Sequence, residues 1–206
     1  MQTRNNQFSG ILSYILHPLI IPTLATSVLL MRPDLYTIVL PNTMKIWFIW
    51  VVFIYTLVIP SAAVLLLVKF KSVYSLELKL RTERTIPLLI AGTSYMVMLY
   101  TLKTTNIPPV ILYVLYSATS ALLAGLLINM IYKISLHTLG WGAVAATLTS
   151  ISLRMGVTLL AIILISWILS GLAGYARLKE NAHNQTQVYL GYVAGVCVII
   201  LISLLG

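Results

Sequence analysis

The segment YARLKENAHNQTQVYLGYVAG, residues 175–195, lies between two strongly apolar runs and carries Arg177, His183 and Gln187. Arginine binds phosphate oxygens through paired hydrogen bonds, and histidine can act as nucleophile or base because its charge changes near neutral pH. On a helix, positions 183 and 187 share a face, so Gln187 can hold one ring nitrogen of His183. The segment is therefore either an ordinary polar loop between two membrane helices or one part of a phosphate site.

The composition places the chain in a membrane. Hydrophobic residues make up 60% of its 206 residues and charged residues only 8%, against roughly 25% charged residues in soluble domains. The excess of 13 Lys and Arg over 4 Asp and Glu suits anionic headgroups or an anionic substrate. Because these basic residues are scattered over short loops, nucleic acid is not an expected partner. With one cysteine, three histidines and four acids, we expect no metal site and no cofactor.

A membrane-spanning helix needs about 20 mainly apolar residues. Seven segments approach this length, and the third and fifth are short. We therefore predict an all-α fold, a polytopic membrane bundle of six to seven transmembrane helices in a single domain over residues 1–206. The short third segment is a span, a re-entrant helix or a helix tilted along the membrane surface. The predicted spans are Phe8–Met31, Ile46–Val68, Ile86–Leu102, Pro109–Tyr132, Leu139–Leu153, Val157–Gly174 and Val188–Leu205.

Span parity predicts where the polar loops lie. Two crossings separate the loop at 69–87 from the turn at 133–137, and two more separate that turn from the loop at 175–187. All three stretches therefore open on one face of the membrane, and the same result holds if residues 86–132 make no crossing. Lys69 and Lys71 in the first loop are expected to contact lipid headgroups.

Two further features of the spans have structural interpretations. His17 is an ionisable residue inside the first span, where function is the default hypothesis. We expect instead a neutral ring that binds a backbone carbonyl freed by Pro18 or Pro22. The glycines of the last two spans are expected to allow close helix packing: Gly171, Gly174, Gly191 and Gly195.

The three polar stretches together offer two arginines, one hydroxyl and two imidazoles. This set suits phosphoryl transfer, in which one histidine attacks phosphorus and the other protonates the leaving oxygen. The sequence contains no GxSxG, HExxH or Walker motif that would indicate another chemistry. The candidate residues are Arg84, Ser135, His137, Arg177 and His183.

In these residues the chain resembles the type-2 phosphatidic-acid phosphatase superfamily of membrane lipid phosphate phosphatases. The family's third motif is Ser-Arg, five residues, His, three residues, Asp, and here Ala176-Arg177, five residues, His183, three residues and Gln187 keep that spacing. Its second motif, Ser-Gly-His, is similar to Ser135-Leu136-His137. Its first motif, Lys, six residues, Arg-Pro, is matched faintly by Arg84-Thr85-Ile86-Pro87. The resemblance covers residues 84–195 in the correct order.

The resemblance implies a role for each matched residue. His183 would be the nucleophile that forms a phosphohistidine, and His137 would be the general acid for the leaving group. Arg84, Arg177 and the Ser135 hydroxyl would hold the phosphoryl oxygens. The substrate would be a lipid phosphate or polyprenyl pyrophosphate that enters sideways from the leaflet, and the site would face the extracytoplasmic side of a bacterial inner membrane.

The chain departs from the family pattern in each motif. Gln187 replaces an Asp that orients and electrostatically supports the nucleophile, and the loss of such a carboxylate costs about 10⁴ in rate when a protease triad Asp becomes Asn. Glu180 is a candidate accessory acid for His183. Leu136 replaces a glycine that would let backbone amides approach phosphate. Glu77 stands where the first motif has its lysine, and Lys79 or Arg81 is the candidate replacement among the phosphate ligands.

The distribution of basic residues bears on orientation. The face with the motifs carries nine Lys and Arg, at positions 4, 69, 71, 79, 81, 84, 133, 177 and 179, against four on the other face, at 32, 45, 103 and 154. The positive-inside rule taken alone would place the motifs in the cytoplasm. Four of the nine are candidate phosphate ligands, and without them the balance is five to four. The extracytoplasmic orientation is therefore retained as the expectation.

The predicted function is that of a metal-independent membrane phosphatase whose partners are a lipid phosphate substrate and membrane lipids. The principal alternative is a catalytically silent relative that binds lipid phosphate as a carrier, sensor or assembly partner. A small transporter is a third hypothesis, which requires an ionisable residue near the middle of the membrane, where only His17 comes close. The sequence does not select the lipid or the oligomeric state.

Overall fold

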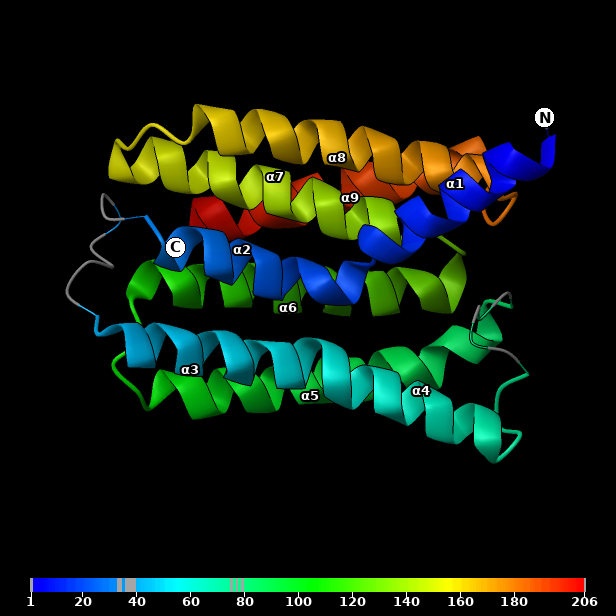
Figure 1. Ribbon diagram of the computed structural model, residues 1–206, viewed down its shortest axis with the longest axis horizontal. Coiled ribbons are helices and arrows are strands. Elements are labelled where there is room, and N and C mark those ends of the chain that lie inside the picture. The colour runs from blue at the N-terminus through cyan, green and yellow to red at the C-terminus, as the bar shows by residue number, and fades with distance from the viewer. Residues whose placement is uncertain are drawn as a thin grey trace.

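A computed structural model describes residues 2–32, 35, 40–74, 76, 78 and 80–205, with the backbone alone for residues 2–7. Within these residues, every regular element is a helix (Figure 1), and together they form one elongated bundle. The long helices are α1 (Gln2–Ile15), α2 (Ile21–Leu30), α3 (Asn42–Phe53), α4 (Ile59–Lys69), α5 (Thr85–Lys103), α6 (Pro109–Ile131), α7 (Leu136–Met155), α8 (Leu160–Lys179) and α9 (Gln185–Leu205).

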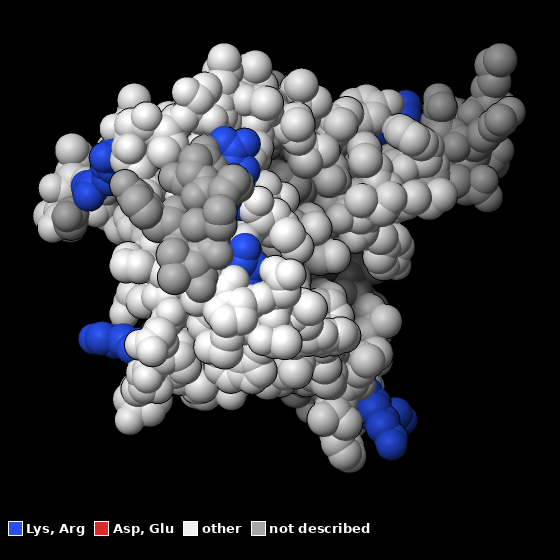
Figure 2. Space-filling view, turned by 60° about the vertical axis from the view of Figure 1, so that its left-hand side comes forward, with Lys and Arg blue, Asp and Glu red and all other residues white. Residues whose placement is uncertain are grey.

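Within the described residues, six segments are long and apolar enough to cross a membrane, so the chain is an all-α, multi-pass membrane protein. The third one, Thr82–Lys103, includes α5, and its 22 residues make it longer than the predicted third span and long enough to cross. Figure 2 shows isolated Lys and Arg side chains on a surface that is otherwise uncharged where it is described. Large apolar side chains on several helices are exposed, as expected for a surface that contacts lipid.

Helix α7 lies inside the bundle, where α6, α8 and α9 pack most extensively on it. It matches the fifth predicted span but is not among the six most apolar segments, because Thr138, Thr147 and Ser150 are placed along it. These side chains are buried, and each hydroxyl forms a hydrogen bond with the protein. A helix that is surrounded by other helices can carry such hydroxyls, because protein groups and not lipid satisfy them.

Glycines bring α7 and α9 into backbone contact. A Cβ atom at Gly191 would lie 2.5 Å from the Ser135 carbonyl oxygen, and one at Gly195 would overlap the Leu139 carbonyl. The prediction of close packing is confirmed at these two positions and at Gly174, where a Cβ would lie 3.1 Å from Val188. It is wrong for Gly171, where a Cβ would meet no atom within 4 Å. The glycines therefore fix the start of α9 beside the start of α7.

The first two spans are bent near their middle. Pro18 ends α1, and a short 3₁₀ turn (Pro18–Ile20) leads into α2. In the second span a π-helical turn (Ile54–Val58) precedes Pro60, which lacks the N–H that a regular helix would use. Helices α2 and α3 pack side by side (Figure 1), whereas α1 packs on α8. As a result, α1 and α4 diverge at the end of the bundle where the site lies.

The three polar stretches meet at one end of the bundle, as span parity predicts. Arg84 Nη1 donates to the Ile134 carbonyl at 3.2 Å, and the Ser135 N–H donates to the Gln187 carbonyl at 3.0 Å. Arg81 Nη1 donates to the Asn129 carbonyl at 3.0 Å, and Asn129 Nδ2 donates back to the Arg81 carbonyl at 3.1 Å. These bonds connect the loop before α5, the turn before α7 and the loop before α9.

Candidate functional site

A cavity of about 560 Å³ opens between the helices at this end of the bundle. Two arginines and three imidazoles line its polar end, and the rest of its wall is almost entirely aliphatic. The basic residues come from five different elements, so only the folded bundle places them together. They are His17, Arg84, His137, Arg177 and His183.

The loop between α8 and α9 places His183 in the cavity wall. Asn181 has a φ of 53°, a left-handed conformation that asparagine tolerates well and that ends α8. The N–H groups of Ala182 and His183 donate to the Arg177 carbonyl at 3.2 and 3.4 Å, which closes the loop over the helix end. Only 7% of His183 is exposed. The ring is therefore held in a fixed position among buried groups.

Gln187 fixes the tautomer of His183. Its Oε1 lies 2.9 Å from His183 Nδ1 and also accepts from the Asn184 N–H at 3.4 Å. Because a backbone N–H can only donate, this amide atom is the oxygen, so His183 Nδ1 is the donor. In the neutral ring the lone pair then lies on Nε2, at the opposite side of the imidazole. The predicted pairing of positions 183 and 187 is confirmed.

The same glutamine belongs to a capping box at the start of α9. Asn184 Oδ1 accepts from the Gln187 N–H at 2.9 Å, while Gln187 Oε1 accepts from the Asn184 N–H. This reciprocal pair satisfies two backbone donors that the helix itself leaves open. Gln187 therefore has a structural function in addition to its contact with His183, and it does not itself line the cavity.

The surroundings of His183 keep its ring neutral. Burial is the main cause that lowers the pKa of His183, and the positive charges of Arg84, Arg177 and Lys133 lower it further, to about 3. The hydrogen bond to Gln187 acts in the opposite direction but is weaker than the burial and Arg84 effects. A neutral imidazole has the free lone pair that a nucleophile needs.

Arg84 lies at the start of the α5 span, between the polar loops. It is 5% exposed, and its Nε and Nη1 donate to the carbonyls of Leu78 and Ile134 at 2.8 and 3.2 Å. Neither partner is an acid, so these bonds orient the guanidinium without neutralising it. Its charge is strong enough at His183 and Lys133 to lower the pKa of both side chains.

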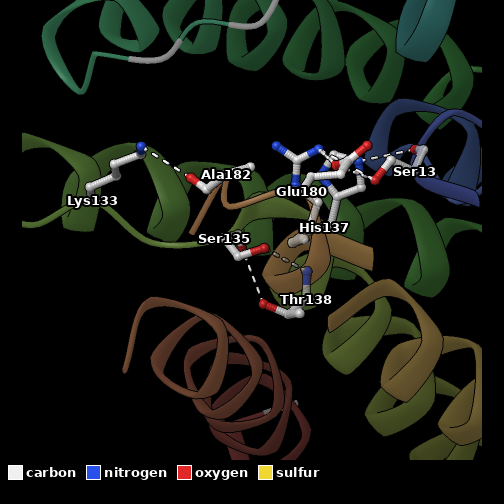
Figure 3. A network of polar contacts seen from close by, with 8 residues as sticks. Ser13, Lys133, Ser135, His137, Thr138, Glu180 and Ala182 are labelled. Atoms are coloured by element: carbon white, nitrogen blue, oxygen red, sulfur yellow. Dashed lines mark hydrogen bonds and ion pairs between the residues drawn. The ribbon is translucent and has the colours of Figure 1, made fainter. Parts of the chain in front are cut away.

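Arg177 and Glu180 form a partly buried polar cluster with Ser13 of α1, and Figure 3 shows Glu180 beside Ser13. Arg177 Nη1 contacts Glu180 Oε2 at 2.7 Å and Ser13 Oγ at 3.4 Å, and Ser13 Oγ donates to Glu180 Oε2 at 2.7 Å. Arg177 lines the cavity as predicted. The structure pairs the Glu180 carboxylate with Arg177 and Ser13 and not with His183, and its role as an accessory acid stays a prediction.

His137 and Trp141 form hydrogen bonds with backbone carbonyls at the C-terminal end of α1. His137 Nε2 lies 3.2 Å from the Ser13 carbonyl, and Trp141 Nε1 donates to the Leu16 carbonyl at 3.0 Å. The break at Pro18 leaves these carbonyls without helical partners, and two residues one turn apart on α7 satisfy them. Since a carbonyl can only accept, His137 carries its proton on Nε2 and has a free Nδ1 when the ring is neutral.

His17 also faces the cavity, beside His137. The two rings meet edge to face, with their centroids 5.3 Å apart. His17 Nδ1 accepts from the Leu19 N–H at 3.3 Å and caps the 3₁₀ turn. The expectation that His17 binds a freed carbonyl is therefore wrong, because His137 and Trp141 take that role. Its ionisable ring within an apolar span was the sequence signal for a place in the site.

Ser135 is the N-cap of α7 and lies outside the cavity lining. Its side chain is fully buried, and its Oγ accepts from the Thr138 N–H at 3.4 Å (Figure 3). Such a bond satisfies one of the open donors at a helix start. The structure therefore places the Ser135 hydroxyl at the helix cap, outside the cavity that the two arginines line, and its role as a phosphate ligand stays a prediction.

Two lysines complete the comparison with the sequence predictions. Lys133 was not among the predicted site residues, yet its Nζ donates to the Ala182 carbonyl at 3.3 Å, next to His183. Burial, Arg84 and Arg177 lower the pKa of Lys133. Its position in the same short turn as His137 was the signal that could have identified it. Lys79 and Glu77 lie outside the described residues.

Comparison with protein-family models, with curated proteins and with solved structures finds no match to this chain. Within the described part of the chain, no group of three or more His, Cys, Asp or Glu side chains is placed to hold a metal ion. What the arrangement offers chemically is a neutral imidazole of fixed tautomer beside two guanidinium groups, at the polar end of an apolar cavity.

Proposed function

We propose that this protein hydrolyses a lipid phosphate or polyprenyl pyrophosphate through a phosphohistidine at His183. One observation carries the proposal: a buried, neutral imidazole, held by its Nδ1–H, lines a cavity that it shares with Arg84 and Arg177. Two guanidinium groups can bind phosphoryl oxygens in a site of low polarity, where such contacts are strong. The resemblance of residues 84–195 to the type-2 phosphatidic-acid phosphatases suggests the same chemistry.

The reaction takes two steps. His183 Nε2 attacks phosphorus, the P–O bond to the leaving alcohol or phosphate breaks, and the leaving oxygen takes a proton from His137. Water then attacks the phosphohistidine, His137 takes a proton from that water, and the P–N bond breaks to release phosphate. The Nδ1–H of His183 keeps its hydrogen bond to Gln187 Oε1 through both steps, so Gln187 is a positioning residue.

His137 needs a second proton before it can act as an acid. Its Nε2–H is engaged by the Ser13 carbonyl, so the transferable proton must lie on Nδ1. A bound phosphate monoanion offsets the positive charge of the neighbouring arginines and can itself supply the proton. Substrate binding would thus prepare the general acid.

A second candidate is a silent lipid-phosphate binder that serves as a carrier, sensor or assembly partner. Two observations favour it: the amide of Gln187 accepts a hydrogen bond but carries no negative charge to offset the cationic ring that forms on attack, and Glu180 already neutralises Arg177 in part. Both hypotheses require phosphate at the same arginines. They differ in whether the P–O bond breaks.

The test is a phosphate-release screen with the protein in nanodiscs, without added metal. The probes are phosphatidic acid, a lysophosphatidate, and undecaprenyl phosphate and pyrophosphate. Wild type should release phosphate from at least one probe, and His183→Ala should abolish that release while retaining the melting temperature. Binding without release would favour the silent binder, and equal release by His183→Ala would refute a role for this imidazole.

A further inference from the structure

The cavity continues far beyond its basic end, into the interior of the bundle. Along α7 its lining runs from Leu136 to Thr147, a rise of about 16 Å at 1.5 Å per residue. That depth is about half of the ~30 Å hydrocarbon thickness of a bilayer, or one leaflet. A site for phosphate alone would need only the basic end.

The deep part of the cavity is apolar and kept open by small side chains. Residues from α2, α5 and α6 line it opposite α7, among them Ala25, Ala91, Val114 and Ala118. Ala118 of α6 is only partly buried and lines the cavity. Ser61, Tyr95 and Thr147 add the few hydroxyls of this wall, and that of Thr147 is already bonded to the Ala143 carbonyl. A wall that is otherwise apolar suits a hydrocarbon.

The cavity also reaches the outer surface of the bundle between α1 and α4. Tyr14 and Leu65 line the cavity and are nevertheless 81% and 57% exposed. The bends at Pro18 and Pro60 separate these helices, which pack instead on α8 and α5. A chain can therefore pass from the surrounding leaflet into the bundle without crossing the polar loops.

We infer that the deep part of this cavity binds one hydrocarbon chain of the substrate inside the helix bundle. The inference rests on the proposed function for its phosphate end, where Arg84 and Arg177 complement the charge of the headgroup. A volume of about 560 Å³ lies within the 300–1,000 Å³ range of cavities that enclose one small ligand. The substrate class is accordingly a single-chain lipid phosphate, prenyl or monoacyl, and a two-chain lipid would have to leave its second chain outside.

Binding of alkyl phosphates tests this inference independently of turnover. Apparent Kd values are obtained from the ligand-induced rise in melting temperature in phosphatidylcholine nanodiscs. Decyl phosphate should bind wild type at least about tenfold more tightly than butyl phosphate, and more tightly than didecanoyl phosphatidate or decanol. Comparing the apparent Kd of farnesyl phosphate with that of decyl phosphate shows whether the cavity prefers a prenyl or a straight alkyl chain.

Ala118→Phe fills the deep cavity, and Ala118→Leu fills it in part. Ala62→Phe is the matched control, because Ala62 is exposed on α4 and does not line the cavity. Ala118→Phe should weaken decyl phosphate by about tenfold and leave butyl phosphate within about twofold. Ala118→Leu should weaken decyl phosphate less, and Ala62→Phe should change neither ligand.

The possible outcomes separate the tail site from the proposed reaction. Equal binding of decyl and butyl phosphate, or equal weakening of both by Ala118→Phe, would overturn the tail site even if His183-dependent release is found. The expected chain-length pattern without any phosphate release would retain the tail site and reject the reaction. Tighter binding of didecanoyl phosphatidate than of decyl phosphate would refute the single-chain class.

Discussion

The two sides of the bundle are packed in opposite ways. Where α7 meets α9, the glycines allow backbone contact, and the starts of both helices are joined by hydrogen bonds between Thr138 Oγ1 and the Val188 carbonyl and between Ser135 and Gln187. Where α1 faces α4, the helices diverge and a cavity reaches the surface. The tight side holds His183 within hydrogen-bonding geometry, and the open side leaves room for a lipid. The pair α7 and α9 thus keeps the site rigid, and the gap between α1 and α4 gives a ligand access to the cavity.

The largest expected effect comes from adding one methyl group to the tight side. Gly195→Ala places a Cβ against the Leu139 carbonyl, which is backbone and cannot rotate away. We expect a loss of more than about 3 kcal/mol of stability, or failure to fold, measured by thermal melting in detergent. Gly171→Ala is the matched control, since its Cβ would meet no atom. Equal stability of the two variants would show that α7 and α9 are not in backbone contact.

Gln187→Glu tests how residue 187 supports His183 on the tightly packed side of the bundle. Glutamate is a natural capping-box residue, so α9 should start as in wild type, while the new carboxylate would raise the pKa of His183 and stabilise the ring during attack. The rate of phosphate release should rise by about tenfold or more. This is a small fraction of the ~10⁴-fold loss in kcat when a protease triad Asp becomes Asn. Gln187→Ala should lower the rate. A slower Gln187→Glu variant of unchanged melting temperature would contradict the assigned role of this position.

The low pKa of His183 predicts how stability depends on pH. In the unfolded chain a histidine takes up a proton near pH 6.5, whereas folded His183 does so only near pH 3. Stability should therefore fall as the pH drops from 6.5 toward 3, by at most about 1.4 kcal/mol per pH unit from this residue. His183→Gln should show a shallower slope in melting experiments over that range. An unchanged slope would mean that the ring is not held neutral.

Ser135→Ala has the smallest expected effect and separates a cap from a ligand. Loss of the N-cap bond should cost about 1 kcal/mol of stability. Because Ser135 lies outside the cavity lining, phosphate release should change by less than about threefold. A rise in KM of tenfold or more, with little change in melting temperature, would show that the Ser135 hydroxyl binds the substrate phosphate.

The sequence was sufficient for the features that depend on hydrophobicity and spacing. Apolar run lengths predicted the all-α membrane bundle, parity predicted that the three polar stretches meet, and the spacing of 183 and 187 predicted their hydrogen bond. The partners of individual polar side chains could not be predicted. Glu180 is as close to Arg177 in sequence as to His183, and only the position of α1 selects Arg177 through Ser13.

The broken first span had the least predictable consequences. Pro18 and Pro22 indicated a kink, but not that His137 and Trp141 of α7 would bind the freed carbonyls. Nor does a local pattern reveal that His17 faces a cavity lined by residues from both halves of the chain. These contacts join residues more than 100 positions apart, so they follow from the packing of the bundle and not from any motif.

The most direct test of the central claim is to trap the phosphoenzyme. The protein in nanodiscs is mixed with a radiolabelled lipid phosphate that it hydrolyses, quenched in alkali within the first turnover, and mapped by peptide mass spectrometry. The account predicts acid-labile label on His183, absent from His183→Ala and retained in Ser135→Ala. Label on another residue, or turnover by His183→Ala at the wild-type rate, would contradict it.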